Sequence, residues 1–278
     1  MHLSIFSILT ERCNYSCSHC STSSTRNSKN QIKSEVLLSV LESFSKFKGL
    51  KKHLVSGGEI VLYPDLKKVL IHSKDLGYNT NAVTNASWVD INNLDRSREL
   101  LDKFFPEKIE ISTSIDIYHL EQDKNLIKKV MVLEKLCEGR NSFTIDGAYN
   151  GKKEFLFLER LLNQRKTNLI PVQSIGSARK LKLLNKLNED KIYCPKGNNL
   201  GFTLTSKGVY FCFRGALNKN IHLKISEDYS SEKINHFIED FSTSDLNKKI
   251  RLLYKNLNKD SKNKINYPCD LCEILGNS

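Results

Sequence analysis

Three closely spaced cysteines near the start of the chain constrain its fold more than any other feature. Cys13, Cys17 and Cys20 follow the spacing Cys-x3-Cys-x2-Cys in the segment CNYSCSHC. Three cysteinates on a short loop can hold three irons of a cubane [4Fe–4S] cluster and leave the fourth iron open to a small molecule. Structural zinc is the alternative, but zinc loops favour paired Cys-x2-Cys knuckles closed by four ligands. The spacing therefore favours an iron–sulfur cluster.

Strands and helices alternate along the first two thirds of the chain. Hydrophobic patterning predicts strands over residues 2–9, 53–55, 78–84, 108–115, 142–148 and 168–174. It predicts helices over residues 34–47, 64–76, 90–104, 119–138 and 152–163. Six such units predict an α/β fold in which a parallel sheet curls into a partial (β/α)6 TIM-type barrel, over about residues 1–190. Ligands of such sheets lie at the carboxyl ends of the strands, where the cysteines also fall.

Two of the predicted strands carry a polar face. Ser112, Ser114 and Asp116 alternate with apolar residues, and residues 142–146 place Ser, Thr and Asp on one face in the same way. A solvent-facing antiparallel sheet also alternates, but helices are expected to cover the outside of this sheet. The polar faces therefore predict a ligand cavity inside the barrel.

The turn Ser56-Gly57-Gly58-Glu59 follows the second predicted strand. Two glycines at a strand end let a ligand approach the backbone without a Cβ in the way. Asn85 follows the third strand, where it is either a site residue or an ordinary turn residue.

The cysteine triad, with a Gly-Gly-Glu turn about forty residues later, resembles the radical S-adenosylmethionine (SAM) enzymes. The resemblance implies that the open iron binds SAM, and that an electron from a flavodoxin- or ferredoxin-like reductant cleaves SAM to a 5′-deoxyadenosyl radical. The cysteines are then the radical-generating site. The expected SAM contacts are His19 on the adenine, the Gly57-Gly58-Glu59 turn on the methionine amino group, Asn85 (in a Thr-Asn-Gly-like segment with Ala86 for glycine), Ser112, Ser114 and Asp116.

Four further cysteines, Cys194, Cys212, Cys269 and Cys272, follow the end of the strand–helix rhythm. Residues 201–212 predict a hairpin that turns at residues 206–208, and residues 231–258 predict a helix. This arrangement resembles the twitch/SPASM-type extension of radical SAM enzymes, although three residues rather than the usual four separate Gly208 from Cys212. It implies a second [4Fe–4S] cluster in a small domain, residues 191–278. Four cysteines suit structural zinc equally well.

The layout most resembles the epimerases that make epipeptides, a class of ribosomally synthesised and modified peptides (RiPPs). The shared features are a Ser/Thr-rich stretch after the cluster loop, the segment from Ser114 to His119, and residues 176–178, Gly-Ser-Ala. Those epimerases carry a hydrogen-donating cysteine directly after the hairpin cluster ligand, where this chain has Phe213. Cys137 is expected to be a buried core thiol. We therefore expect hydrogen abstraction from a peptide with net oxidation rather than epimerisation.

Other classes remain open on the sequence alone. Aminocyclitol dehydrogenases of antibiotic pathways combine a short barrel with a similar four-cysteine extension. We also expect no separate leader-binding domain before the barrel, which favours a small-molecule substrate over a peptide. A metal-stabilised nucleic-acid-binding protein would use the net charge of +12. No basic run interleaved with aromatics supports that class, and the lysines are expected on solvated helix faces. Without a membrane-spanning run or a signal peptide, we expect a cytoplasmic oxidoreductase.

Overall fold

The structure, a computed structural model, describes residues 2–46, 49–163, 165–172, 176–181, 200–210, 224–226, 229 and 232–233. These residues form one nine-stranded sheet with the strand order β6-β5-β4-β3-β2-β1-β7-β8-β9. The strands are β1 (His2–Ile8), β2 (Leu50–Ser56), β3 (Asn79–Thr84), β4 (Glu110–Ser114), β5 (Ser142–Tyr149), β6 (Thr167–Pro171), β7 (Leu200–Thr205), β8 (Gly208–Tyr210) and β9 (Lys224–Ser226). All neighbours from β6 to β7 are parallel. The six predicted strands and their parallel pairing are confirmed.

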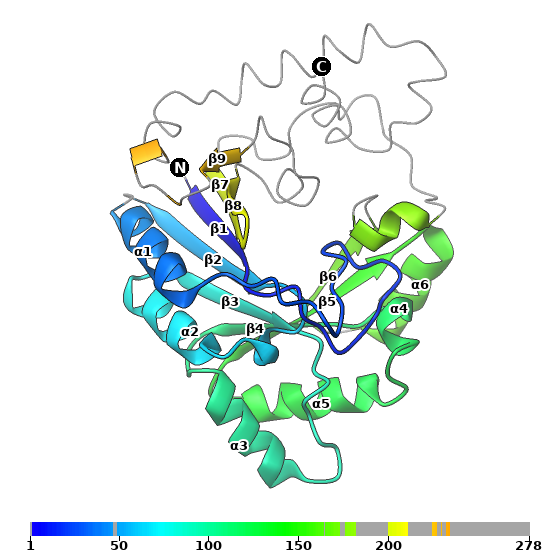
Figure 1. Cartoon of the computed structure of the whole chain (residues 1–278). Coiled ribbons are helices and arrows are strands. Elements are labelled where there is room, and N and C mark those ends of the chain that lie inside the picture. The colour runs from blue at the N-terminus through cyan, green and yellow to red at the C-terminus, as the bar shows by residue number, and fades with distance from the viewer. Residues whose placement is uncertain are drawn as a thin grey trace, which may run out of the picture.

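Helices cover the outer face of this curved sheet (Figure 1). They are α1 (Ser34–Ser45), α2 (Leu66–Asp75), α3 (Leu94–Phe104), α4 (Ile117–Leu120), α5 (Leu126–Cys137) and α6 (Lys152–Leu161), with 3-10 turns η1 (Ile60–Leu62) and η2 (Gly176–Lys180). Each long helix turns an apolar stripe to the sheet, as Leu37, Val40, Leu41 and Phe44 do in α1. The segment between β1 and α1 crosses the inner side, near the ends of the strands (Figure 1).

One predicted helix is divided. Residues 119–138 were expected to be continuous, but the chain forms α4 and α5 with a turn over residues 121–125 between them. Asp116 caps α4, since its Oδ1 accepts a hydrogen bond from the backbone N–H of His119 at 2.9 Å. In the turn, Asp123 accepts from the Tyr15 hydroxyl at 2.9 Å and Gln122 from the backbone N–H of Ser16 at 3.1 Å. The turn therefore anchors the cysteine loop, which a continuous helix could not do.

The predicted hairpin is confirmed as β7 and β8, which pair antiparallel around residues 206–207. Its position was not predicted, because β7 also pairs in parallel with β1 and so extends the barrel sheet. The domain boundary at residue 190 stays a prediction. Cys194, Cys212, Phe213, Cys269, Cys272 and all but two residues of the expected 231–258 helix lie outside the described residues.

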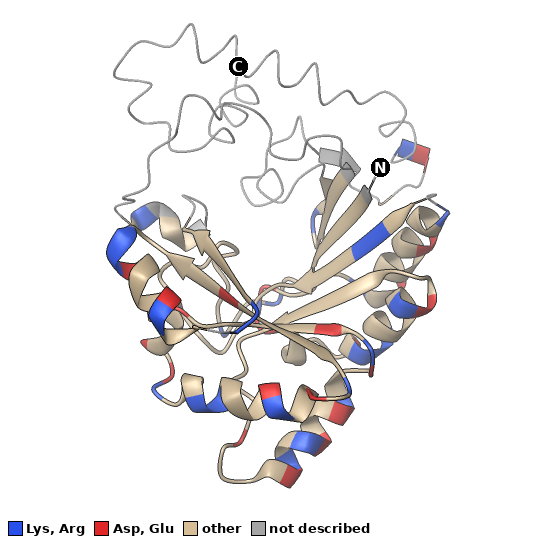
Figure 2. Ribbon diagram, turned by 180° about the vertical axis from the view of Figure 1, so that it is seen from behind, with Lys and Arg blue, Asp and Glu red and all other residues tan. Residues whose placement is uncertain are grey.

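Residues of both charge signs are interspersed along the outer helices (Figure 2), which agrees with the expectation of lysines spread over solvated faces. Within the described part of the chain, no helix combines the length and apolar character needed to cross a bilayer.

Candidate functional site

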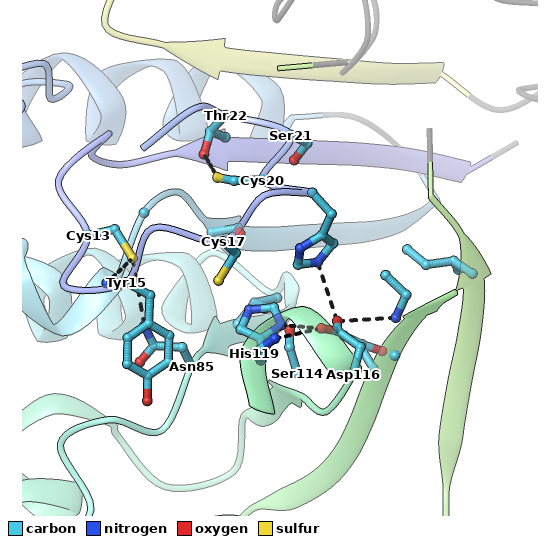
Figure 3. Close-up of a pocket in the computed structure, with 18 of the residues that line it drawn as sticks. Cys13, Tyr15, Cys17, Cys20, Ser21, Thr22, Asn85, Ser114, Asp116 and His119 are labelled. Atoms are coloured by element: carbon cyan, nitrogen blue, oxygen red, sulfur yellow. Dashed lines mark hydrogen bonds and ion pairs between the residues drawn. The ribbon is translucent and has the colours of Figure 1, made fainter. Parts of the chain in front are cut away.

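A cavity of about 340 Å³ lies at the carboxyl ends of the parallel strands, a size within the range of ~300–1,000 Å³ typical of small-molecule sites. Its lining comes from the cysteine loop and from the ends of β2 to β6 (Figure 3). The lining residues include the three predicted cluster cysteines, His19, Gly57, Gly58, Asn85, Ser114, Asp116, Tyr15, Ser21, Thr22, His119 and Asp146. Most of the predicted site residues are thus brought together around one cavity.

The three thiols Cys13, Cys17 and Cys20 are free and line the same cavity. Backbone N–H groups of Tyr15 and Ser24 donate to the sulfurs of Cys13 and Cys20, each at 3.4 Å. Burial raises the pKa of Cys13 to about 12, so a metal must displace its proton. Three thiols with hydrogen-bond donors already aimed at two of their sulfurs fit a cubane cluster with one open iron.

The Gly-Gly turn closes on the cysteine loop. The N–H of Gly58 donates to the carbonyl of Thr10 at 2.6 Å, and the N–H of Glu59 donates to that of Arg12 at 2.9 Å. A Cβ at Gly57 would lie 2.4 Å from the Thr10 carbonyl oxygen, and one at Gly58 would lie 2.1 Å from that of Arg12. The glycines line the cavity as expected, but the close approach that excludes a Cβ is to the chain's own backbone.

Glu59 is fully buried behind the lining of the cavity. One carboxylate oxygen accepts from the Thr84 hydroxyl and the other from the backbone N–H of Asn85, both at 2.7 Å. Burial raises the pKa of Glu59, which these hydrogen bonds partly offset. Asn85 lines the cavity, and its amide donates to Asn14 at 3.0 Å and to the Cys13 sulfur at 3.7 Å. Glu59 therefore holds the turn that carries Asn85, in which Ala86 has a φ of +57°, the region that favours glycine.

Asp116 lies at the far side of the cavity and contacts the cysteine loop, α4 and β5 (Figure 3). Its Oδ1 lies 2.9 Å from Nδ1 of His119, and its Oδ2 lies 3.3 Å from both Nε2 of His19 and the N–H of Ala148. Burial alone would raise the pKa of Asp116, but His119 and His19 outweigh it and hold the pKa well below its usual range. Burial alone would lower the pKa of His119, but Asp116 and then Cys17 raise it to about 10.

His19 lies at the cavity wall, and its ring stacks on Tyr118 with centroids 4.4 Å apart; its contact with adenine stays a prediction. Ser114 lines the cavity, whereas Ser112 is fully buried behind the lining and accepts from the Asn81 amide at 3.0 Å. The Gly-Ser-Ala segment lies in η2, where the N–H of Ser177 donates to the carbonyl of Cys20 at 2.9 Å. The segment thus packs on the cysteine loop.

Sequence reasoning did not assign Tyr15, Thr22, His119 and Asp146 to the site, although all line the cavity. Asp146 stood on the polar face that predicted the cavity, although it was not assigned as a SAM contact, and His119 ends the segment from Ser114 to His119 that carried the resemblance. Thr22 lies in the Ser/Thr-rich stretch, and its hydroxyl is 3.3 Å from the Cys20 sulfur. Tyr15 could be found only from its contact with Asp123 in the folded chain.

Comparison with known proteins agrees with this geometry. Residues 7–143 match the sequence model of the radical SAM superfamily. The Bacillus subtilis (strain 168) protein YydG, named for a suggested role in peptide biosynthesis, is 26% identical over 208 residues, which cover 67% of this chain and 62% of YydG. The match therefore spans less than two thirds of that relative.

Two solved structures share the fold. The structure of anSMEcpe with bound AdoMet and Cp18Cys peptide superposes with a TM-score of 0.63 at 14% identity, covering 98% of this chain and 95% of that chain. Streptococcus suis SuiB bound to the precursor peptide SuiA gives a TM-score of 0.51 at 19% identity, covering 68% of this chain and 43% of that chain. At these identities the likeness establishes the fold.

Over residues 7–143 the chain is similar in sequence to the radical SAM superfamily, and the curved parallel sheet and the cysteine-lined cavity agree with that similarity. This similarity supports an enzyme that uses a [4Fe–4S] cluster and SAM as its cofactors. Structures of anSMEcpe and of SuiB contain bound AdoMet.

Proposed function

We propose that this protein is a radical SAM oxidoreductase that abstracts a hydrogen atom from a ribosomally synthesised peptide and completes a net oxidation. The observation that carries the radical SAM part is the meeting of three free thiols with the Gly57-Gly58 turn around one cavity at the strand ends. When bound, the cluster and SAM supply the radical chemistry, namely one-electron cleavage of SAM to a 5′-deoxyadenosyl radical.

The chain's own contribution is to hold and orient these groups. Cys13, Cys17 and Cys20 would be the cluster ligands, with backbone N–H groups hydrogen-bonded to the sulfurs. His19, Gly57, Gly58, Asn85, Ser114 and Asp116 would contact SAM from the lining of the cavity. Glu59 and Ser112 lie behind that lining and would act by fixing Asn85 and the neighbouring strand. Closing these walls around SAM excludes water from a reactive intermediate.

A peptide substrate is supported by the similarity to YydG and by the peptide-bound structures of similar fold. The proposed net oxidation rests on whether a side chain beside the cavity can return a hydrogen atom to the substrate radical. Inversion at carbon requires a donor such as a thiol beside the substrate. Among the described residues, the thiols at the cavity are the three proposed cluster ligands. Cys137 is buried and is the last residue of α5, just before β5 begins. It therefore lies near the amino-terminal ends of the strands, opposite the cavity.

Mass spectrometry of a candidate precursor peptide co-produced with the enzyme tests this reaction. We expect a loss of two hydrogens per modification, through dehydrogenation or a new bond. An unchanged mass in H2O, with one deuterium gained at carbon in D2O, would instead establish epimerisation.

A second [4Fe–4S] cluster on Cys194, Cys212, Cys269 and Cys272 is also proposed, as the one-electron acceptor of the substrate radical. Anaerobic reconstitution should give about eight irons per chain, and replacement of Cys13, Cys17 and Cys20 by alanine should leave about four, because each cubane holds four irons. Zinc at the C-terminal set would contradict this second cluster without affecting the first.

A further inference from the structure

Two histidines share one carboxylate beside the cluster cysteines. His19, from the cysteine loop, and His119, from α4, each direct one ring nitrogen to a different oxygen of Asp116. All three side chains are largely buried, with exposures of 12% for His19, 15% for His119 and 1% for Asp116. The arrangement leaves one nitrogen of each ring for another partner.

The identity of those nitrogens follows from the chemistry of the carboxylate. A carboxylate accepts hydrogen bonds, so Nε2 of His19 and Nδ1 of His119 carry the hydrogens that face Asp116. The opposite atoms, Nδ1 of His19 and Nε2 of His119, are therefore the ones that can bind a metal ion. Because Asp116 raises the pKa of His119, Nε2 of His119 must lose a proton to do so. Nδ1 of His19 is buried and has no hydrogen-bond partner. A buried nitrogen without a partner is costly, which points to a ligand that the protein alone does not supply.

The Cys17 sulfur completes this group. One ligand atom each from Cys17, His19 and His119 lies within 4.8 Å of the other two. Cys17 and His119 both line the cavity, and the Cys17 sulfur points toward the His119 ring, with Asp116 on the other side of that ring (Figure 3). Cysteine and histidine are the ligands that zinc and similar divalent ions prefer, and histidines that bind a metal commonly donate their other ring N–H to a carboxylate. Here a single Asp116 supplies that support to both histidines.

We propose that the chain without its N-terminal cluster binds one divalent transition-metal ion, of the Zn²⁺ or Fe²⁺ class, through Cys17, His19 and His119. Binding forms three coordinate bonds and releases the Cys17 thiol proton, and any proton on the coordinating nitrogens, to solvent. The thiolate and the Asp116 carboxylate together balance the two positive charges of the ion. A water molecule would fill the fourth position of a tetrahedral site.

This site and the proposed cluster share Cys17, so only one of them can be occupied at a time. A bound divalent ion would therefore block cluster assembly at the N-terminal loop, and its removal would permit it. The inference concerns the cluster-free chain and needs neither SAM nor a peptide substrate, so it can fail while the proposed function holds.

The test is zinc binding by the reduced, cluster-free, full-length chain under anaerobic conditions, measured by competition with a chromophoric chelator. Cys17→Ala and His119→Gln should each bind one Zn²⁺ fewer per chain than the wild type. Cys13→Ala and Cys20→Ala, in the same loop, should bind as many as the wild type. The C-terminal cysteines contribute equally in all variants and cancel in these differences.

A measurement on the wild type guards against variants that misfold. Two of the seven histidines in the chain should change their ring ¹⁵N signals as this zinc site fills. One equivalent of Zn²⁺ should also slow iron–sulfur reconstitution in the wild type more than in His119→Gln. Equal losses of zinc in all three cysteine variants would indicate a three-thiol site instead. Unchanged histidine signals would overturn the proposal directly.

Discussion

Two aspartates near the ends of the neighbouring strands β4 and β5 line one cavity but have different partners. Asp116 is held ionised by the two facing histidines, whereas burial raises the pKa of Asp146, whose Oδ1 accepts from the Asn168 amide. Replacement by asparagine costs more for a buried carboxylate paired with histidines than for a carboxyl group hydrogen-bonded to an amide. The two positions therefore form a matched pair for mutation.

We expect Asp116→Asn to lower the free energy of unfolding of the cluster-free protein by about 2–4 kcal/mol, because it breaks a buried charge pair. Asp146→Asn should cost less than about 1 kcal/mol. Urea denaturation monitored by circular dichroism measures both. Equal effects of the two substitutions would mean that the histidines do not hold Asp116 as a charge.

His53 supplies a pH dependence at the residue scale. It is fully buried, with its Nε2 2.8 Å from the Ser7 hydroxyl and its Nδ1 2.8 Å from the Ser73 hydroxyl. Burial lowers the pKa of His53 to about 3, so below pH 6.5 the unfolded chain takes up a proton that the folded chain refuses. The stabilisation is complete above pH 6.5 and is lost as the pH falls toward 3.

Between pH 6 and pH 4 the wild type should lose about 1.4 kcal/mol per pH unit relative to His53→Gln, which has no group to titrate. Urea midpoints at several pH values give this difference, and titrations common to both proteins cancel. Parallel stability curves would show that His53 is protonated in the folded state.

At the scale of elements, the cysteine loop is held by two turns from other parts of the chain. The turn between α4 and α5 receives the Tyr15 hydroxyl on Asp123, which Lys129 also contacts at 2.8 Å. Tyr15→Phe removes one hydrogen bond to a charged group, worth about 1.5–3 kcal/mol. We expect faster amide hydrogen exchange over residues 13–20 with unchanged exchange in β1 and β2. Faster exchange throughout would instead indicate global destabilisation.

The Gly-Gly turn is the second support. Gly58→Ala would place a Cβ 2.1 Å from the Arg12 carbonyl oxygen, so the loop must move away from the turn. We expect this variant to retain less than half of the iron that the wild type binds at the N-terminal site, counted with the C-terminal cysteines replaced by alanine in both. Ser56→Ala changes the same turn without adding a Cβ and should retain iron. Full iron in Gly58→Ala would show that the loop tolerates the displacement.

Periodicity in the sequence predicted the strands and helices well, because each strand of a covered parallel sheet and each amphipathic helix has its own pattern. The break at residues 121–125 was missed, since it depends on Tyr15 and Ser16, more than a hundred residues away. Likewise, alternation placed Ser112 with Ser114, but only the folded structure shows that Ser112 lies behind the cavity wall. Contacts of this kind have no local signature.

At the scale of the whole molecule, the fold brings the N-terminal loop, the Gly-Gly turn and the ends of β3, β4 and β5 to one cavity. The central claim is that this cavity generates the radical. In the proposed cluster its three cysteines would act as a unit, because loss of one ligand would remove a corner of the cluster. Cys137 offers a control, since it is a buried thiol outside the lining of the cavity.

The decisive measurement is the yield of 5′-deoxyadenosine when the anaerobically reconstituted protein is incubated with SAM and dithionite. The wild type and Cys137→Ala should both form it, and Cys17→Ala should form none above the background of the reagents. Formation at the wild-type level by Cys17→Ala, or none by a wild type that holds iron at the N-terminal site, would contradict the assignment of this cavity as the radical SAM site.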